Sequence, residues 1–334
     1  MKLIIFNRNF LALFSILFSG LILQACNVEK NNKSTPNYEK ANPLEQNVYF
    51  ANGNYIYEHI KKNKRDTVRV VGLNLKKIKK DGDYVPPLNL TIPSRVVLNK
   101  KSFPVTSIRA YAFEKCPYIK QICIPNSVTD IGCYAFEQCP NLEKVILSNR
   151  LKSINRAVFY SCPKLTNINL PDSITTINPY AFSGCKNIQL TSLPDSINFL
   201  GYEAFGDCEK INIKKLPAGI KINGKCFYRC KNLALENLPE GITSIRDYAF
   251  FGCKNIKLTK LPDSLKIVRK CAFSGCEGVD IKKISEKTLF SIDAFDNKNI
   301  YNLIPEKRII KNSINSISKF YYSLYNPNLS YSSL

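Results

Sequence analysis

A phenylalanine recurs every 22 or 23 residues through the middle of the chain, and this period constrains the fold more than any other feature. The nine positions are Phe113, Phe136, Phe159, Phe182, Phe205, Phe227, Phe250, Phe273 and Phe295. A cysteine follows three residues after each of the first eight. Self-similarity at this period is typical of a stacked solenoid, in which each unit packs only against its neighbours. The sequence therefore predicts about nine coils and a function on the surface.

The repeat from Cys162 to Cys185 shows how one coil forms. Its predicted inward side chains are Leu165, Ile168, Leu170, Ile174, Ile177 and Phe182. Ile168 and Leu170 alternate as in a strand, and Pro171–Ser173 supplies turn chemistry. Stacking such coils at the strand spacing of 4.7–4.9 Å gives a rod about 40 Å long with a continuous phenylalanine column.

The repeats follow two inward patterns. The early ones place apolar residues three, six and eight positions after the cysteine, and the later ones place them at three, five and eight. Because the inward pattern sets local geometry, we expect the rod to bend or shift near residues 185–195.

The cysteines are predicted to be structural. Thirteen cysteines in an exported chain ordinarily suggest a disulfide framework. Eight of them keep register with the core, however, and a free cysteine behaves as a small buried hydrophobe. Stacked neighbours are close enough that some oxidised pairs remain open. No C-x-x-C pair is present, so a metal site is not expected.

The N-terminus predicts export. Lys2 and Arg8 precede an apolar run from Phe10 to Leu23, which is too short to span a bilayer and suits a signal sequence. The following Gln24-Ala25-Cys26 resembles the end of a bacterial lipoprotein signal, which implies lipid attachment at Cys26. The alternative is an ordinary secretory signal cleaved near Ala25. Residues 1–25 are thus assigned as signal and 26–46 as a flexible tether rich in polar residues.

The segments flanking the repeats read differently. From 47 to 91 we expect a β cap, with strands that cover the first coil. The expected strands are 48–50, 55–57, 68–71 and, just beyond, 96–98, with turns at Asn52-Gly53 and Asp81-Gly82. The solenoid is assigned to 92–299. Residues 300–334 fit either a C-terminal cap or a tail.

The residues at 124–139, IPNSVTDIGCYAFEQC, carry a recognisable pattern. With them, the array from about 92 to 296 resembles the BspA-like class of leucine-rich repeats found in bacterial surface proteins. The resemblance implies a right-handed, curved β solenoid whose strand-bearing side binds host proteins, host cell surfaces or other microbes. It brings no catalytic residues, and fold transfers between such proteins better than partner does.

Enzymatic chemistry has little support in the sequence. The one histidine, His59, falls in the cap region, where we expect a surface residue, so the usual base for a Ser or Cys nucleophile is missing from the repeats. The phosphate-binding G-x-x-x-x-G-K pattern is absent. No enzyme activity, cofactor or metal is predicted.

The charge favours acidic partners. Lys and Arg number 48 and Asp and Glu 26, giving a net charge of +22. Such a surface attracts polyanions, and outside a cell these are acidic glycans, acidic proteins and anionic membranes rather than nucleic acid. An AT-rich genome also yields chains rich in Lys, Asn and Ile, and this alternative stays open.

The candidate ligand-binding residues follow the strand side of the repeats. They are Ile146, Asn169, Ser192, Lys214, Lys215, Lys257, Lys260, Lys282 and Lys283. We expect a two-part face, apolar in the early repeats and basic in the late ones. The predicted function is adhesion or ligand binding at the cell surface. The alternative is an envelope scaffold that binds the cell's own acidic polymers.

Overall fold

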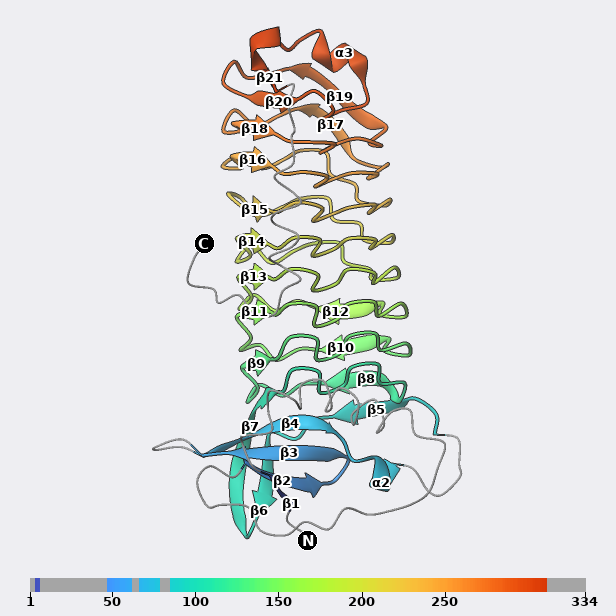
Figure 1. Cartoon of the computed structure of the whole chain (residues 1–334), viewed down its shortest axis with the longest axis vertical. Helices are drawn as coiled ribbons and strands as arrows, with labels where there is room; N and C mark the ends of the chain where they lie inside the picture. The colour runs from blue at the N-terminus through green and yellow to red at the C-terminus, as the bar shows by residue number, and fades with distance from the viewer. Residues whose placement is uncertain (1–3, 7–46, 62–65, 79–84, 311–334) are drawn as a thin grey trace.

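The computed structural model describes residues 4–6, 47–61, 66–78 and 85–310, which form a rod of stacked coils on a β-rich cap (Figure 1). The predicted β solenoid of leucine-rich-repeat type is confirmed. Within these ranges no helix combines the length and hydropathy needed to cross a bilayer.

The N-terminal cap is built on one mixed sheet. Its elements are β1 (Ile4–Phe6), β2 (Asn47–Asn52), β3 (Tyr55–Ile60), β4 (Thr67–Leu73), α2 (Leu75–Ile78), β6 (Arg95–Leu98) and β7 (Lys101–Ile108). The strand order is β1-β2-β3-β4-β7-β6. All four strands expected here are present, and Gly53 closes the β2–β3 turn with a φ of 58°. Asp81-Gly82 lies outside the described residues.

The sheets pass from cap to solenoid without a break. β7 pairs in parallel with β4 on one side and with β9 (Asp130–Ile131) of the first coils on the other. β5 (Leu88–Thr91) likewise pairs in parallel with β8 (Ile119–Cys123). The cap therefore covers the first coil by continuing its hydrogen-bond ladder.

The coils contribute to two rows of short parallel strands, of which the first is interrupted in the middle of the rod. The first row contains β5, β8, β10 (Lys144–Ile146) and β12 (Asn167–Asn169), and later β17 (Lys257–Lys260) and β19 (Gly278–Lys283). The second row contains β9, β11 (Ser153–Ile154), β13 (Thr176–Ile177), β14 (Phe199–Leu200), β15 (Lys221–Ile222), β16 (Ser244–Ile245), β18 (Ile267–Val268), β20 (Leu289–Ser291) and β21 (Ile309–Ile310).

Near residues 185–195, where we expected a bend or shift of the rod, the first row loses its strand pairing, while the second row stays paired through β13, β14 and β15. Among the described residues the first row stops at β12 and resumes at β17. In the coils between them, the second inward residue has moved from position six to position five after the cysteine. Two consecutive residues, such as Lys214 and Lys215, then lie between buried ones and both face outward. A strand alternates strictly, so this pattern disturbs pairing. Where pairing returns with the same pattern, in β17 and β19, the register shifts between Leu258 and Lys260.

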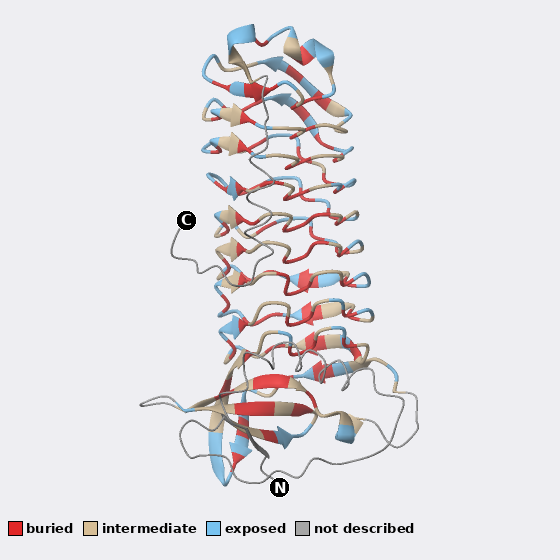
Figure 2. Cartoon of the chain, viewed as in Figure 1, coloured by how far each residue is buried: buried red, intermediate tan, exposed pale blue. Residues whose placement is uncertain are grey.

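The phenylalanine column forms the centre of the rod. All nine rings are buried, adjacent centroids lie 5.0–5.5 Å apart, and the ring planes agree within 17°. Figure 2 shows buried residues in every coil of the rod. The predicted aromatic column is confirmed.

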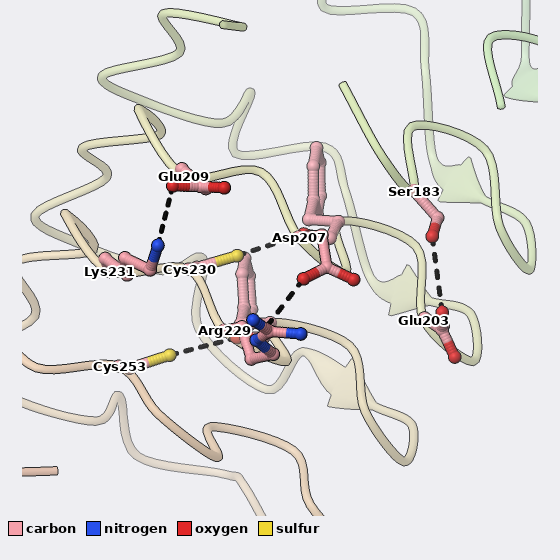
Figure 3. Close-up of polar contacts among 10 residues, drawn as sticks. Ser183, Glu203, Asp207, Glu209, Arg229, Cys230, Lys231 and Cys253 are labelled. Atoms are coloured by element: carbon pink, nitrogen blue, oxygen red, sulfur yellow. Dashed lines mark hydrogen bonds and ion pairs between the residues drawn. The ribbon is translucent and has the colours of Figure 1, made fainter. Parts of the chain in front are cut away.

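The periodic cysteines link each coil to the one before. Cys139, Cys162, Cys185, Cys208, Cys230, Cys253 and Cys276 each donate their S–H to the backbone carbonyl of the phenylalanine of the preceding coil, at 2.9–3.1 Å. Two of these bonds, from Cys230 and Cys253, are drawn in Figure 3. The 12 cysteines of the described residues are all free thiols. The prediction of a structural cysteine column is confirmed.

The C-terminal end is closed in part by a different structure. α3 (Lys298–Tyr301) and the short 3-10 helix η2 (Glu306–Arg308) follow the last coil, and β21 pairs in parallel with β20. Ile300 and Ile304 are buried against that coil. Residues 300–310 thus form a cap. Residues 311–334 lie outside the described residues.

Candidate ligand-binding face

The first strand row places the early candidates on an outward surface. In β10 and β12, Ile146 and Asn169 are direct partners, and Cys123 lies opposite Ile146 on the other side. Because side chains alternate along a strand, the neighbouring Val145 and Ile168 point into the core and are buried. Ile146 and Asn169 are both exposed, as predicted.

The apolar half of the face is smaller than expected. Ile122, Val145 and Ile168 all point inward, so the large apolar side chain that it presents to solvent is Ile146, 39% exposed. Cys123 beside it is only half-buried. The early face is therefore a single apolar contact point in polar surroundings.

A second outward column was missed by the sequence reasoning. Gln121, Lys144 and Asn167 pair in register two residues before the first column. The alternation of a strand places these two columns on the same side, so applying period two to positions five and seven of the early repeats identifies them. Together the two columns make an early surface rich in amides.

Four of the late lysines lie on two paired strands. Lys260 of β17 and Lys283 of β19 are direct partners on parallel strands. Lys257 and Lys282 are exposed on the same two strands. Like charges placed opposite each other repel, so this pair costs the fold some stability. Lys282 differs from the others, because its Nζ lies 2.6 Å from a carboxylate oxygen of Asp280.

The lysines do not form one uninterrupted patch. Ser192, Lys214 and Lys215 are exposed in coils without first-row strands, and Glu236 with Asn237 separates them from β17. The basic half thus consists of two clusters, at 214–215 and around β17 and β19. Cys26, the predicted lipid site, lies outside the described residues.

His59 is not a surface residue, contrary to expectation. Its side chain is only 9% exposed, its ring packs on Phe103 at 4.7 Å, and its Nε2 lies 3.3 Å from a carboxylate oxygen of Asp66. The alternation of β3 places it on the same face of the sheet as the buried Tyr55 and Tyr57. Because His59 lies in the cap and not in the repeats, it does not supply a general base at the candidate face.

A ladder of tyrosines and cations lines another side of the rod. Tyr111 and Tyr134 stack at 4.9 Å. Further along, the guanidinium of Arg156 lies 5.5 Å from the ring of Tyr180. Lys225 spans Tyr202 and Tyr228 at 5.9 and 5.4 Å. These residues hold neighbouring coils together by ring stacking and cation–π attraction.

Two glutamates lie beside the first tyrosines of this ladder. Burial, with the charge of Glu114 on the adjacent coil, raises the pKa of Glu137 to about 7. Lys115 pairs with Glu114 at 3.1 Å.

The described residues contain no group of three or more His, Cys, Asp or Glu side chains suited to a metal.

Comparison with known proteins agrees with this architecture. The family described as BspA type leucine rich repeat region, with six copies, matches residues 106–234 and 220–331. Among solved structures, a leucine-rich repeat protein from Bacteroides ovatus is 29% identical with a TM-score of 0.59. That match covers 72% of this chain and 61% of the other, so it spans less than two thirds of that protein.

Two further solved structures are less similar in shape. A leucine-rich repeat protein from Bacteroides capillosus is 29% identical over 41% of this chain and 93% of its own, with a TM-score of 0.35. A leucine rich repeat protein of T. pallidum is 21% identical over 75% and 94%, with a TM-score of 0.47. No curated protein matches the chain.

Proposed function

Because the chain belongs to the BspA-type leucine-rich-repeat family, a family of bacterial surface proteins, we propose that it is an exported protein that binds macromolecules outside the cell. The binding surface is the outward face of the first strand row. The fold is one that typically serves as a binding scaffold, and we propose no catalytic activity or cofactor for it. The proposed location is the cell surface, with a lipid anchor at Cys26. Cleavage before Cys26 removes β1, the edge strand that pairs with β2, and leaves the rest of the cap sheet.

One observation carries the choice of this face. Lys260 and Lys283 lie opposite each other, exposed, on paired strands. A repelling pair has no value for the fold itself. An acidic ligand laid across both strands would turn the repulsion into attraction. Lys214 and Lys215 extend the same chemistry toward the middle of the rod.

We propose that the ligand is an acidic glycan or an acidic protein segment. An extended polyanion can follow the rod and contact several coils in succession. Its early end would meet Ile146 and the amides of Asn167 and Asn169, which suit hydrogen bonding to hydroxyl and carbonyl groups. A scaffold that binds the cell's own acidic polymers uses the same surface, and the source of the polymer distinguishes the two roles.

Charge reversal tests the face directly. The triple variant Lys215→Glu, Lys260→Glu and Lys283→Glu should lose heparin binding at low salt while circular dichroism stays unchanged. The control triple is Lys152→Glu, Lys221→Glu and Lys266→Glu, which removes three exposed lysines from around the second strand row. Unchanged binding in the first triple would rule out this face, and equal loss in both triples would show that net charge alone attracts the polymer.

A further inference from the structure

The N-terminal cap carries a steeper excess of positive charge than the coils. Residues 47–108 contain 12 basic and 4 acidic residues, whereas residues 109–310 contain 29 and 19. Two of the four acids in the cap are already engaged. Glu58 is buried and accepts a hydrogen bond of 2.6 Å from Arg69, and Asp66 lies beside His59. Among the described residues of the cap, every charged side chain that is fully exposed is therefore a lysine or an arginine.

Six exposed residues form what we call the cap patch. They are Lys76, Lys77, Arg95, Val97, Lys100 and Lys101. The first two belong to α2, and the others belong to the hairpin of β6 and β7. Figure 1 shows α2 and β6 at the end of the rod opposite α3. Val97 is 53% exposed, among the most exposed large apolar side chains of the described residues.

Hydrogen bonds hold the two parts of the cap patch next to each other. The side-chain amide of Asn74, just before α2, donates to the carbonyl of Gly53 in the β2–β3 turn at 3.2 Å. From the same turn, the amide of Asn52 donates to the carbonyl of Val97 at 3.3 Å. The turn thus bridges α2 and the hairpin, which places the lysines of both at the same end of the rod (Figure 1).

The sequence places this end nearest to a lipid anchor. Twenty residues, 27–46, separate Cys26 from the cap. A chain of that length spans at most about 70 Å. The cap is the part of the rod joined to this tether, so an anchor at Cys26 keeps it within about 70 Å of the bilayer whichever way the rod points.

We propose that the cap patch docks on the anionic phospholipid headgroups of the membrane that anchors the chain. This inference rests on the lipid anchor of the proposed function. Each lysine or arginine near an anionic bilayer strengthens the contact roughly fivefold. Val97 presents an apolar side chain that can enter the headgroup layer. Docking at this end directs the coils, and the strand face with them, away from the membrane.

Hydrogen exchange of the membrane-bound full chain tests the contact. The chain is reconstituted into vesicles of phosphatidylcholine, with or without 30% phosphatidylglycerol. Amides of α2 and of the β6–β7 hairpin should exchange about tenfold more slowly with the anionic lipid. The quadruple variant Lys76→Glu, Lys77→Glu, Lys100→Glu and Lys101→Glu should lose this protection.

The control removes four lysines from the coils, namely Lys152, Lys164, Lys221 and Lys266, each changed to Glu. It should keep the protection. Equal exchange in both kinds of vesicle would overturn the proposal, as would protection of the cap by soluble heparin or inorganic phosphate over neutral vesicles. Mass spectrometry of Cys26 from the native membrane tests the anchor separately, and heparin binding by the cap variant tests the strand face.

Discussion

At the scale of single residues, the phenylalanine of each repeat has two roles. Its ring stacks in the column, and its backbone carbonyl accepts the thiol of the next coil, as for Phe159 and Cys185. The sequence predicted the first role, because the 22- or 23-residue period places the rings in register. It could not predict the second, since no side-chain pattern marks a backbone acceptor. This is why the cysteines repeat with the phenylalanines.

Truncating one ring should be costly. Phe205→Ala is expected to destabilise the protein by about 3–5 kcal/mol, because a fully buried ring between two others leaves a cavity. Urea unfolding followed by circular dichroism measures this. Phe199→Ala, at a half-buried position of β14, is the matched control and should cost far less. A loss below about 1 kcal/mol at Phe205 would contradict the aromatic column.

At the scale of strands and coils, the sequence predicted which residues point inward, but it did not predict which coils form strands. Positions three and eight after the cysteine are buried in early and late repeats alike, for example Leu165 and Leu170 or Ile188 and Leu193. Strand pairing also depends on whether the residues between them alternate. The sequence showed where the inward pattern changes. It did not show that strand pairing returns at β17, because pairing depends on the backbone of both β17 and β19.

The paired lysines of β17 and β19 lead to a test in which binding and stability move in opposite directions. Lys260→Glu should stabilise the protein by about 0.2–1 kcal/mol, because it replaces repulsion across the strands by attraction to Lys283. Polyanion binding should weaken in the same variant. Lys257→Glu is the control, since its partner across the strands is Gly278. Thermal unfolding compares the two, and an equal change in both would contradict the pairwise repulsion.

At the scale of the whole molecule, the features that follow from the repeat could be predicted, and those that depend on individual long-range contacts could not. Sequence reasoning predicted the rod, its spacing and the exposed lysines, because these follow from periodicity. It did not predict the separation of the lysines into two clusters or the cap patch. Those depend on which coils form strands and on contacts such as Asn52 to Val97, which join segments 45 residues apart.

The buried thiols should make stability fall at alkaline pH. Burial raises the pKa of thiols such as Cys208, Cys226 and Cys253 well above the ordinary value. Below about pH 8.5 the thiols are neutral in the folded and the unfolded chain alike, so their ionisation does not lower the free energy of unfolding there. Above that pH the unfolded chain releases protons that the folded chain retains. The free energy of unfolding should then fall by up to about 1.4 kcal/mol per pH unit for each such thiol.

Melting temperatures between pH 7.5 and 10.5, in reducing buffer, measure this slope. Cys208→Ala and Cys253→Ala should each flatten it, whereas Phe199→Ala, which removes no thiol, should not. A melting temperature that is constant over this range would show that the thiols ionise equally in both states.

The direction of the bonds between coils decides how the rod responds to mechanical load. The strands run across the rod, so the hydrogen bonds between parallel partners such as β10 and β12 point along it. A pull between the two ends stretches these bonds lengthwise and opens one coil at a time. Each opened coil of 22 or 23 residues releases roughly 75 Å of extended chain. Under tension the rod therefore lengthens many-fold by unfolding one coil after another, while its two ends stay attached.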